Sequence, residues 1–172
     1  MATRSTILYS AAAVRRLLGL PASVPVQIKE FLKVLWVHVK GQRPTFISKT
    51  DLKVHFVEHR KAEARSLEVM DWLRSPARYT VTNPQSGSRH EVTGHRDRLD
   101  CDCEDYYWQQ QFFGRGCCKH GYAVLRYRGF DSLRSYIAAQ ATPTAASPSQ
   151  PSYSAQLNLL HPGQLDALDD AA

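Results

Sequence analysis

The sequence CDCEDYYWQQQFFGRGCCKH occupies residues 101–120 and holds all four cysteines of the chain. Two positions that are two residues apart on a strand point to the same face, so Cys101 and Cys103 can present both sulfurs to one ion. Cys118 and His120 repeat that spacing and complete a set of four donors. Clustered cysteines beside a histidine indicate metal binding rather than a disulfide framework. Three thiolates and one imidazole form a closed tetrahedral shell, which predicts one structural Zn²⁺ per chain.

Alternatives to this ligand set exist in the sequence. Cys117 directly precedes Cys118 and offers a competing pair with His120, while His90 and His95 are possible substitute ligands. A full shell leaves no position for a substrate water, and no phosphate-binding loop, nucleophile motif or paired carboxylates stand out. The sequence therefore predicts that the protein is not an enzyme, with no catalytic residue and no small-molecule substrate.

The segments around the cysteines predict a small ββα unit. Residues 79–82 are rich in strand formers, 83–87 form a turn, and 91–93 begin a returning strand that we expect to continue through Leu99 into the first cysteine pair. A helix is expected to begin near His120, and Asp131 is expected to cap a last helix that ends near Gln140. Of the residues between the cysteine pairs, we expect most aromatics to be buried and 109–111 to face solvent.

The CxC…CxH pattern behind a hairpin, with Gly121 to Leu125 continuing into an apolar helix, resembles the SWIM-type zinc finger family. The resemblance covers residues 79–127. It implies zinc binding by Cys101, Cys103, Cys118 and His120. The family occurs in helicase-like remodelling proteins and Mutator-type transposases, which implies a role in binding nucleic acid or protein.

The region before the hairpin predicts mostly helix. Residues 11–18 have helical spacing, a second helix is expected over 26–39, and a short strand over 45–48. Ser48 and Asp51 predict the start of a third helix, which we expect to carry Leu67 inward and to continue to Glu68. This arrangement over residues 5–60 resembles the helix-turn-helix of excisionase or MerR-like proteins.

Together these features predict an α+β protein in three parts. A helical region that resembles the winged-helix type occupies 1–74; a zinc module occupies 75–140; and a disordered tail occupies 141–172, where Ala, Ser, Thr and Pro dominate. Apolar residues in 155–160, Leu165 and Leu168 are the tail's only candidate for a partner-binding motif.

The charge distribution indicates an acidic partner. The chain has a formal net charge of +6, and three of its 16 acids but none of its 22 Lys and Arg residues lie in 141–172, so residues 1–140 carry +9. Nucleic acid is the predicted partner, DNA in preference to RNA, and a protein-interaction adaptor is the alternative. The candidate phosphate contacts of the zinc module are Arg89, Arg96, Arg98, Lys119, Arg126 and Arg128.

Reduced cysteines and the lack of a long apolar stretch predict an intracellular protein without a membrane segment. The cytoplasm is the expected compartment, with the nucleoid or nucleus as variants. The absence of acids in residues 1–29 leaves organelle targeting open.

Overall fold

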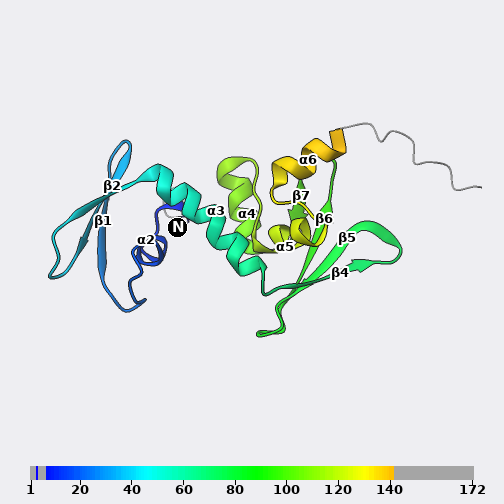
Figure 1. The fold of residues 1–172 in the computed structure, drawn as a ribbon, viewed down its shortest axis with the longest axis horizontal. Helices are drawn as coiled ribbons and strands as arrows, with labels where there is room; N and C mark the ends of the chain where they lie inside the picture. Colours follow the sequence, from blue (N-terminus) through cyan, green and yellow to red (C-terminus); the bar gives the residue numbers. More distant parts are fainter. Residues whose placement is uncertain (1–2, 4–6, 142–172) are drawn as a thin grey trace, which may run out of the picture. The chain divides into compact units, whose positions relative to one another are not determined.

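The computed structural model describes residue 3 and residues 7–141. Within these residues the protein is α+β, with five helices and two antiparallel sheets (Figure 1). None of the described helices is both long and apolar enough to span a bilayer. The predicted tail, apart from Ala141, lies outside the described residues.

The first sheet has three strands in the order β1-β2-β3. Their bounds are β1 Val26–Glu30, β2 Val34–Val39 and β3 Thr45–Ser48. Helix α2, Ala11–Leu17, precedes the sheet and is capped by the Ser10 hydroxyl, which accepts a hydrogen bond from the Ala13 amide. One face of the sheet forms a core with α2 and with Leu52 of the following helix. The buried members of this first core are Ala13, Val14, Leu35, Val37, Ile47 and Leu52.

The helix predicted over 26–39 is wrong, since these residues form the β1–β2 hairpin. The prediction placed Ile28, Phe31, Leu32, Leu35 and Val39 on one helix face. The separation of four between Leu35 and Val39 fits both a helix face and alternate positions of a strand. The structure follows the second period, because burial along β2 alternates residue by residue. Leu32, expected on the buried helical face, is 88% exposed in the turn. The two-helix arrangement implied by the helix-turn-helix resemblance is therefore not what these residues form.

Helix α3, Lys49–Ala64, confirms the predicted third helix and its cap, because the Ser48 hydroxyl accepts a hydrogen bond from the Thr50 amide. It ends earlier than predicted. Glu68–Trp72 is instead strand β4, the first strand of the second sheet. Leu67 is buried as expected, but it belongs to the loop between α3 and β4. Residue 74, where we placed the end of the first domain, lies in the turn between β4 and β5, and Ser75 is the first residue of β5, so both positions fall within one sheet.

The second sheet has four strands in the order β4-β5-β6-β7. Strands β5, Ser75–Thr82, and β6, Arg89–Gly94, confirm the predicted hairpin. The returning strand does not continue into the cysteines as predicted. The chain reverses at 95–98, where the His95 amide donates to the Arg98 carbonyl at 2.8 Å, and β7, Leu99–Cys101, pairs back onto β6.

Three helices complete the described chain: α4 Glu104–Phe113, α5 Lys119–Tyr127 and α6 Leu133–Ala141. Helix α5 lies against the second sheet (Figure 1) and supplies Ala123, Val124 and Leu125 to its core. Helix α4 was not predicted. The last helix was predicted, but its first turn is capped by the Ser132 hydroxyl, which accepts from the Ser135 amide, rather than by Asp131.

Candidate metal centre

The four predicted ligands come from three elements that meet at one point. Cys101 is the last residue of β7, Cys103 is the N-cap of α4, Cys118 is the N-cap of α5, and His120 is the second residue of α5. Both cap sulfurs accept a backbone hydrogen bond at 3.4 Å, Cys103 from the Tyr106 amide and Cys118 from the Gly121 amide. The amide dipoles at a helix N-terminus favour negative charge, so both helix ends stabilise thiolates.

The donor atoms are close enough to hold one metal ion. All four lie within 4.8 Å of one another. The His120 Nδ1 atom is 3.7 Å from the Cys101 sulfur and 3.9 Å from the Cys118 sulfur. Tetrahedral zinc with the usual bond lengths of about 2.3 and 2.0 Å places such sulfur and nitrogen atoms about 3.6 Å apart. The observed separations therefore match a shared ion to within a few tenths of an ångström.

Burial closes the cluster on most sides. Cys103, Cys118 and His120 are buried, and only Cys101 is partly exposed. The His90 ring lies against the His120 ring with a centroid separation of 4.1 Å, and its Nδ1 contacts an Asp102 carboxylate oxygen at 2.9 Å. His90 thus lies beside a predicted ligand without joining the donor group, and so does not replace one.

The sulfurs perturb one another strongly. The pKa of Cys101 is raised, chiefly because its thiol is hydrogen-bonded to Cys103 and Cys118. The pKa of Cys103 is lowered, chiefly because its sulfur accepts hydrogen bonds from Cys101 and Cys118. A divalent ion that binds three thiolates and a neutral imidazole replaces the thiol protons and leaves the site with a net charge of −1, so metal binding releases protons from this site.

Cys117 faces away from the cluster. Its side chain belongs to the hydrophobic core formed by α5 and the second sheet. Burial raises the pKa of the Cys117 thiol well above its usual value, which keeps it neutral. A side chain at position 121 would place its Cβ 2.8 Å from the Cys117 sulfur, so glycine is required at that position. The structure brings Cys118, and not Cys117, to the other three donors.

A partly buried chain of polar side chains leads from α3 to the second pair of donors, and sequence reasoning missed it. Arg60 forms two hydrogen bonds to the Asp105 carboxylate, at 2.9 and 2.5 Å. Gln109 donates to the same carboxylate at 3.1 Å and accepts from the Cys117 amide at 3.0 Å. We expected Gln109 to face solvent, but it is 3% exposed. The available signal was its spacing of four residues from Asp105, which places both on one face of a helix.

The six basic side chains predicted to contact nucleic acid differ in whether they already form hydrogen bonds or ion pairs within the protein. Arg126 donates to the carbonyls of Arg65 and Leu67, both at 3.1 Å, and Arg128 donates to the Tyr79 hydroxyl at 2.8 Å. Two others form ion pairs: Arg98 with Asp97 and Asp100, and Lys119 with Glu63.

Arg89 and Arg96 differ from those four, because neither side chain has a hydrogen bond or ion pair with the part of the chain that the structure describes. Both side chains are exposed. They are therefore the two candidates of the six whose charge is available to a ligand.

No family model, curated protein or solved structure matches this chain. The capacity to hold a metal ion therefore rests on the geometry of the four donors themselves.

Proposed function

We propose that the chain binds one structural Zn²⁺ through Cys101, Cys103, Cys118 and His120, and that this SWIM-type module serves a nucleic-acid-binding protein. The observation that carries the proposal is the cluster itself, with three sulfurs and one imidazole nitrogen within 4.8 Å of one another. Thiolate and imidazole donors in a tetrahedral set favour zinc over magnesium or calcium, which prefer oxygen. Four protein ligands leave no open coordination position, which supports a structural role rather than catalysis.

Charge supports nucleic acid as the partner. Residues 1–140 carry a net charge of +9, from the 22 basic residues of the chain and all but three of its acids. Such an excess attracts polyanions through contacts that weaken steeply with salt. DNA is the proposed ligand in preference to RNA, on the resemblance to zinc modules of transposases and remodelling proteins.

Two neighbouring cysteines provide a matched test of the zinc site. Cys118→Ser removes a ligand, whereas Cys117→Ser changes a core residue beside it, so purified Cys117→Ser is expected to keep about one equivalent of zinc and Cys118→Ser to lose it. Zinc content is measured by elemental mass spectrometry on protein dialysed against a weak chelator. Wild-type protein in which β7, α4 and α5 stay folded without metal would contradict the proposal.

Nucleic-acid binding is tested separately, by fluorescence anisotropy with labelled oligonucleotides over a range of salt concentrations. Arg89→Gln combined with Arg96→Gln is expected to lower the affinity and the steepness of its salt dependence, because both side chains are free to contact phosphate. Arg74→Gln removes one positive charge from an exposed residue of the β4–β5 turn, and it is the control for the effect of losing a positive charge elsewhere on the surface. Absence of binding at low salt would reject this half of the proposal.

A protein-interaction adaptor is the second candidate, and one observation favours it. Strand β4 is an edge of the second sheet, and Met70, Trp72 and the following Leu73 are exposed apolar residues. An exposed apolar edge can accept a strand from a partner. Absent oligonucleotide binding together with a partner captured by wild type but not by Met70→Lys would favour this candidate.

A further inference from the structure

The first sheet presents two different faces. Along β2, Leu35, Val37 and Val39 point into the core with α2 and α3, and the alternate residues point the other way. We call this second side the outer face. With the paired positions of β1 and β3, its residues are Gln27, Lys29, Val34, Trp36, His38, Phe46 and Ser48. None of them is acidic, and none belongs to either sheet's buried core.

Aromatic side chains gather on the outer face. The strand register places Lys29, Trp36 and Phe46 side by side on three adjacent strands. The Trp36 and His38 rings stack with a centroid separation of 5.7 Å, and the Phe46 ring lies 6.5 Å from that of Phe31 in the β1–β2 turn. The Phe46 side chain is 65% exposed. Burial of a phenylalanine ring is favourable, so an exposed ring on a sheet face is a candidate contact for a ligand.

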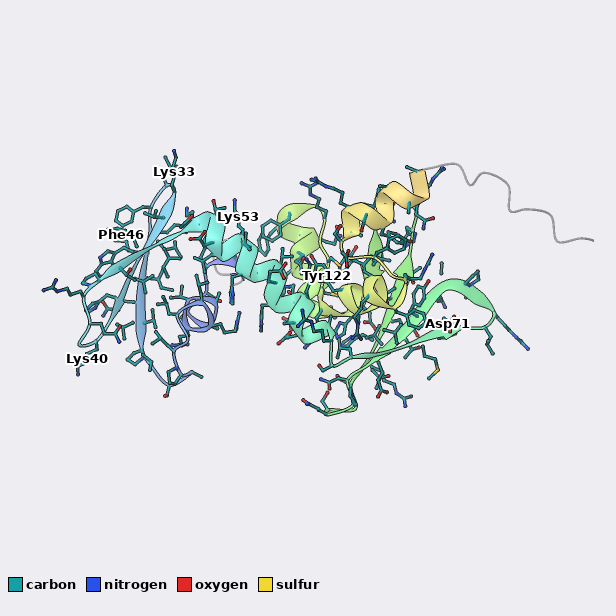
Figure 2. The ribbon with its side chains drawn as sticks, viewed as in Figure 1. Lys33, Lys40, Phe46, Lys53, Asp71 and Tyr122 are labelled. Carbon is teal, nitrogen blue, oxygen red and sulfur yellow. The ribbon has the colours of Figure 1, made fainter. Side chains whose placement is uncertain are left out.

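Positive charge surrounds these rings. Residues 31–50 contain no acid and four basic residues. Lys33 lies in the β1–β2 turn, and Lys40 and Arg43 lie in the β2–β3 loop, so cations stand at both ends of the central strand (Figure 2). The fourth, Lys49, forms an ion pair at 2.6 Å with Glu30. Lys29 extends the charge onto the face itself, with its Nζ 5.6 Å from the centre of the Phe31 ring.

We infer that the outer face of the first sheet binds a single-stranded polynucleotide, with unpaired bases stacked on Trp36 and Phe46 and phosphates beside Lys29, Lys33 and Lys40. An exposed Phe46 ring next to a half-buried Trp36 ring, with cations beside them, matches the two chemical parts of a single strand, a flat base and an anionic backbone. A duplex hides the base faces that the rings would contact. The inference shares with the proposed function only the class of ligand, because the outer face contains no residue of the metal module.

The decisive comparison uses the zinc-loaded full chain and three labelled probes: oligo(dT), oligo(U) and a DNA duplex of equal length. We expect single strands to bind more tightly than the duplex, and Phe46→Ala to weaken their binding about tenfold through loss of one stacking contact. Tyr107→Ala, which removes a ring that is 53% exposed on α4, is the matched control and should leave the affinity unchanged. The dT and U arms show which sugar is preferred.

Two further variants separate stacking from charge. Lys33→Gln with Lys40→Gln should make the logarithmic salt slope shallower by about 1.4, which is about 0.7 for each phosphate contact on a single strand. Phe46→Ala should leave that slope unchanged. Oligonucleotide binding should also quench the Trp36 emission, and Trp36→Phe should lose most of that change while keeping most of the affinity, because another ring occupies the site.

Three results would overturn the inference. The first is equal affinity of Phe46→Ala and wild type for both single strands. The second is a preference for duplex. The third is Phe46-dependent self-association without oligonucleotide binding, which would make the outer face a contact between copies of the chain. Loss of binding in the Arg89 and Arg96 double variant with full binding by Phe46→Ala would reject this inference alone, whereas no binding by wild type would reject both.

Discussion

The side chain of Gln109 shows how one amide can position a candidate metal donor without belonging to the donor cluster. Its oxygen accepts from the Cys117 amide, one residue before Cys118, and its nitrogen donates to Asp105. The chain must also approach it closely, since a Cβ on Gly116 would lie 2.5 Å from the Gln109 Cβ. The Gly-Cys-Cys sequence therefore combines a close approach, a core thiol and a ligand in three consecutive residues.

Gln109→Leu is expected to lower the free energy of unfolding of the zinc-loaded protein by about 2 kcal/mol, because it leaves the Cys117 amide buried without a hydrogen-bond partner. The measurement is urea unfolding followed by circular dichroism. Gln111→Leu, an exposed position on the same helix, is the control and is expected to change stability by less than about 0.5 kcal/mol. Equal effects of the two substitutions would show that the Gln109 hydrogen bonds contribute nothing measurable.

At the scale of elements, sequence patterns identified the segments whose local signal was unambiguous. The hairpin of β5 and β6 has strand formers around a turn, and α3 has a serine cap, so both were predicted. The ligand set was equally local, because two pairs of identical spacing come from short stretches of chain. The prediction for the residues of the β1–β2 hairpin was wrong because the spacing of Leu35 and Val39 fits both the helical and the strand period.

Other elements could not be predicted because tertiary contacts decide them. Helix α4 carries three adjacent aromatics and three adjacent glutamines, and its apolar and polar residues do not separate onto faces by sequence alone. Its boundaries follow from Cys103 as N-cap and from Gly114, whose φ of 65° ends the helix. The last strand of the second sheet, β7, depends on pairing with β6, which no pattern within three residues can specify.

The end of α3 provides a test at this scale. Arg126 of α5 donates to the carbonyls of Arg65 and Leu67, which satisfies acceptors at and after the helix terminus. Arg126→Ala is expected to lower stability by about 1 kcal/mol, since the contacts are charge-assisted but partly exposed to water. Arg96→Ala is the control and should change it little. If Arg126→Ala and the control have the same thermal unfolding midpoint, the Arg126 side chain does not stabilise the end of α3.

The two sheets have separate cores that share α3. Leu52, near the start of the helix, packs with the first sheet, and Ala64, at its end, packs with the second. All four donors lie on β7, α4 and α5 or directly between them, and none lies among the residues of the first core. Removal of a metal ion should therefore affect the two cores unequally.

Hydrogen exchange with and without a zinc chelator tests this. We expect β7, α4 and α5 to lose protection on metal removal, because three free thiols cannot hold these elements together as a bound ion does. Strands β1–β3 and α2 are expected to keep theirs, since their core contains no ligand. Cys117→Ser keeps all four donors and should respond to the chelator as wild type does. Cys118→Ser should show the protection pattern of the chelated protein even without chelator. Equal loss of protection in both sheets would show instead that α3 transmits the loss of metal from one core to the other.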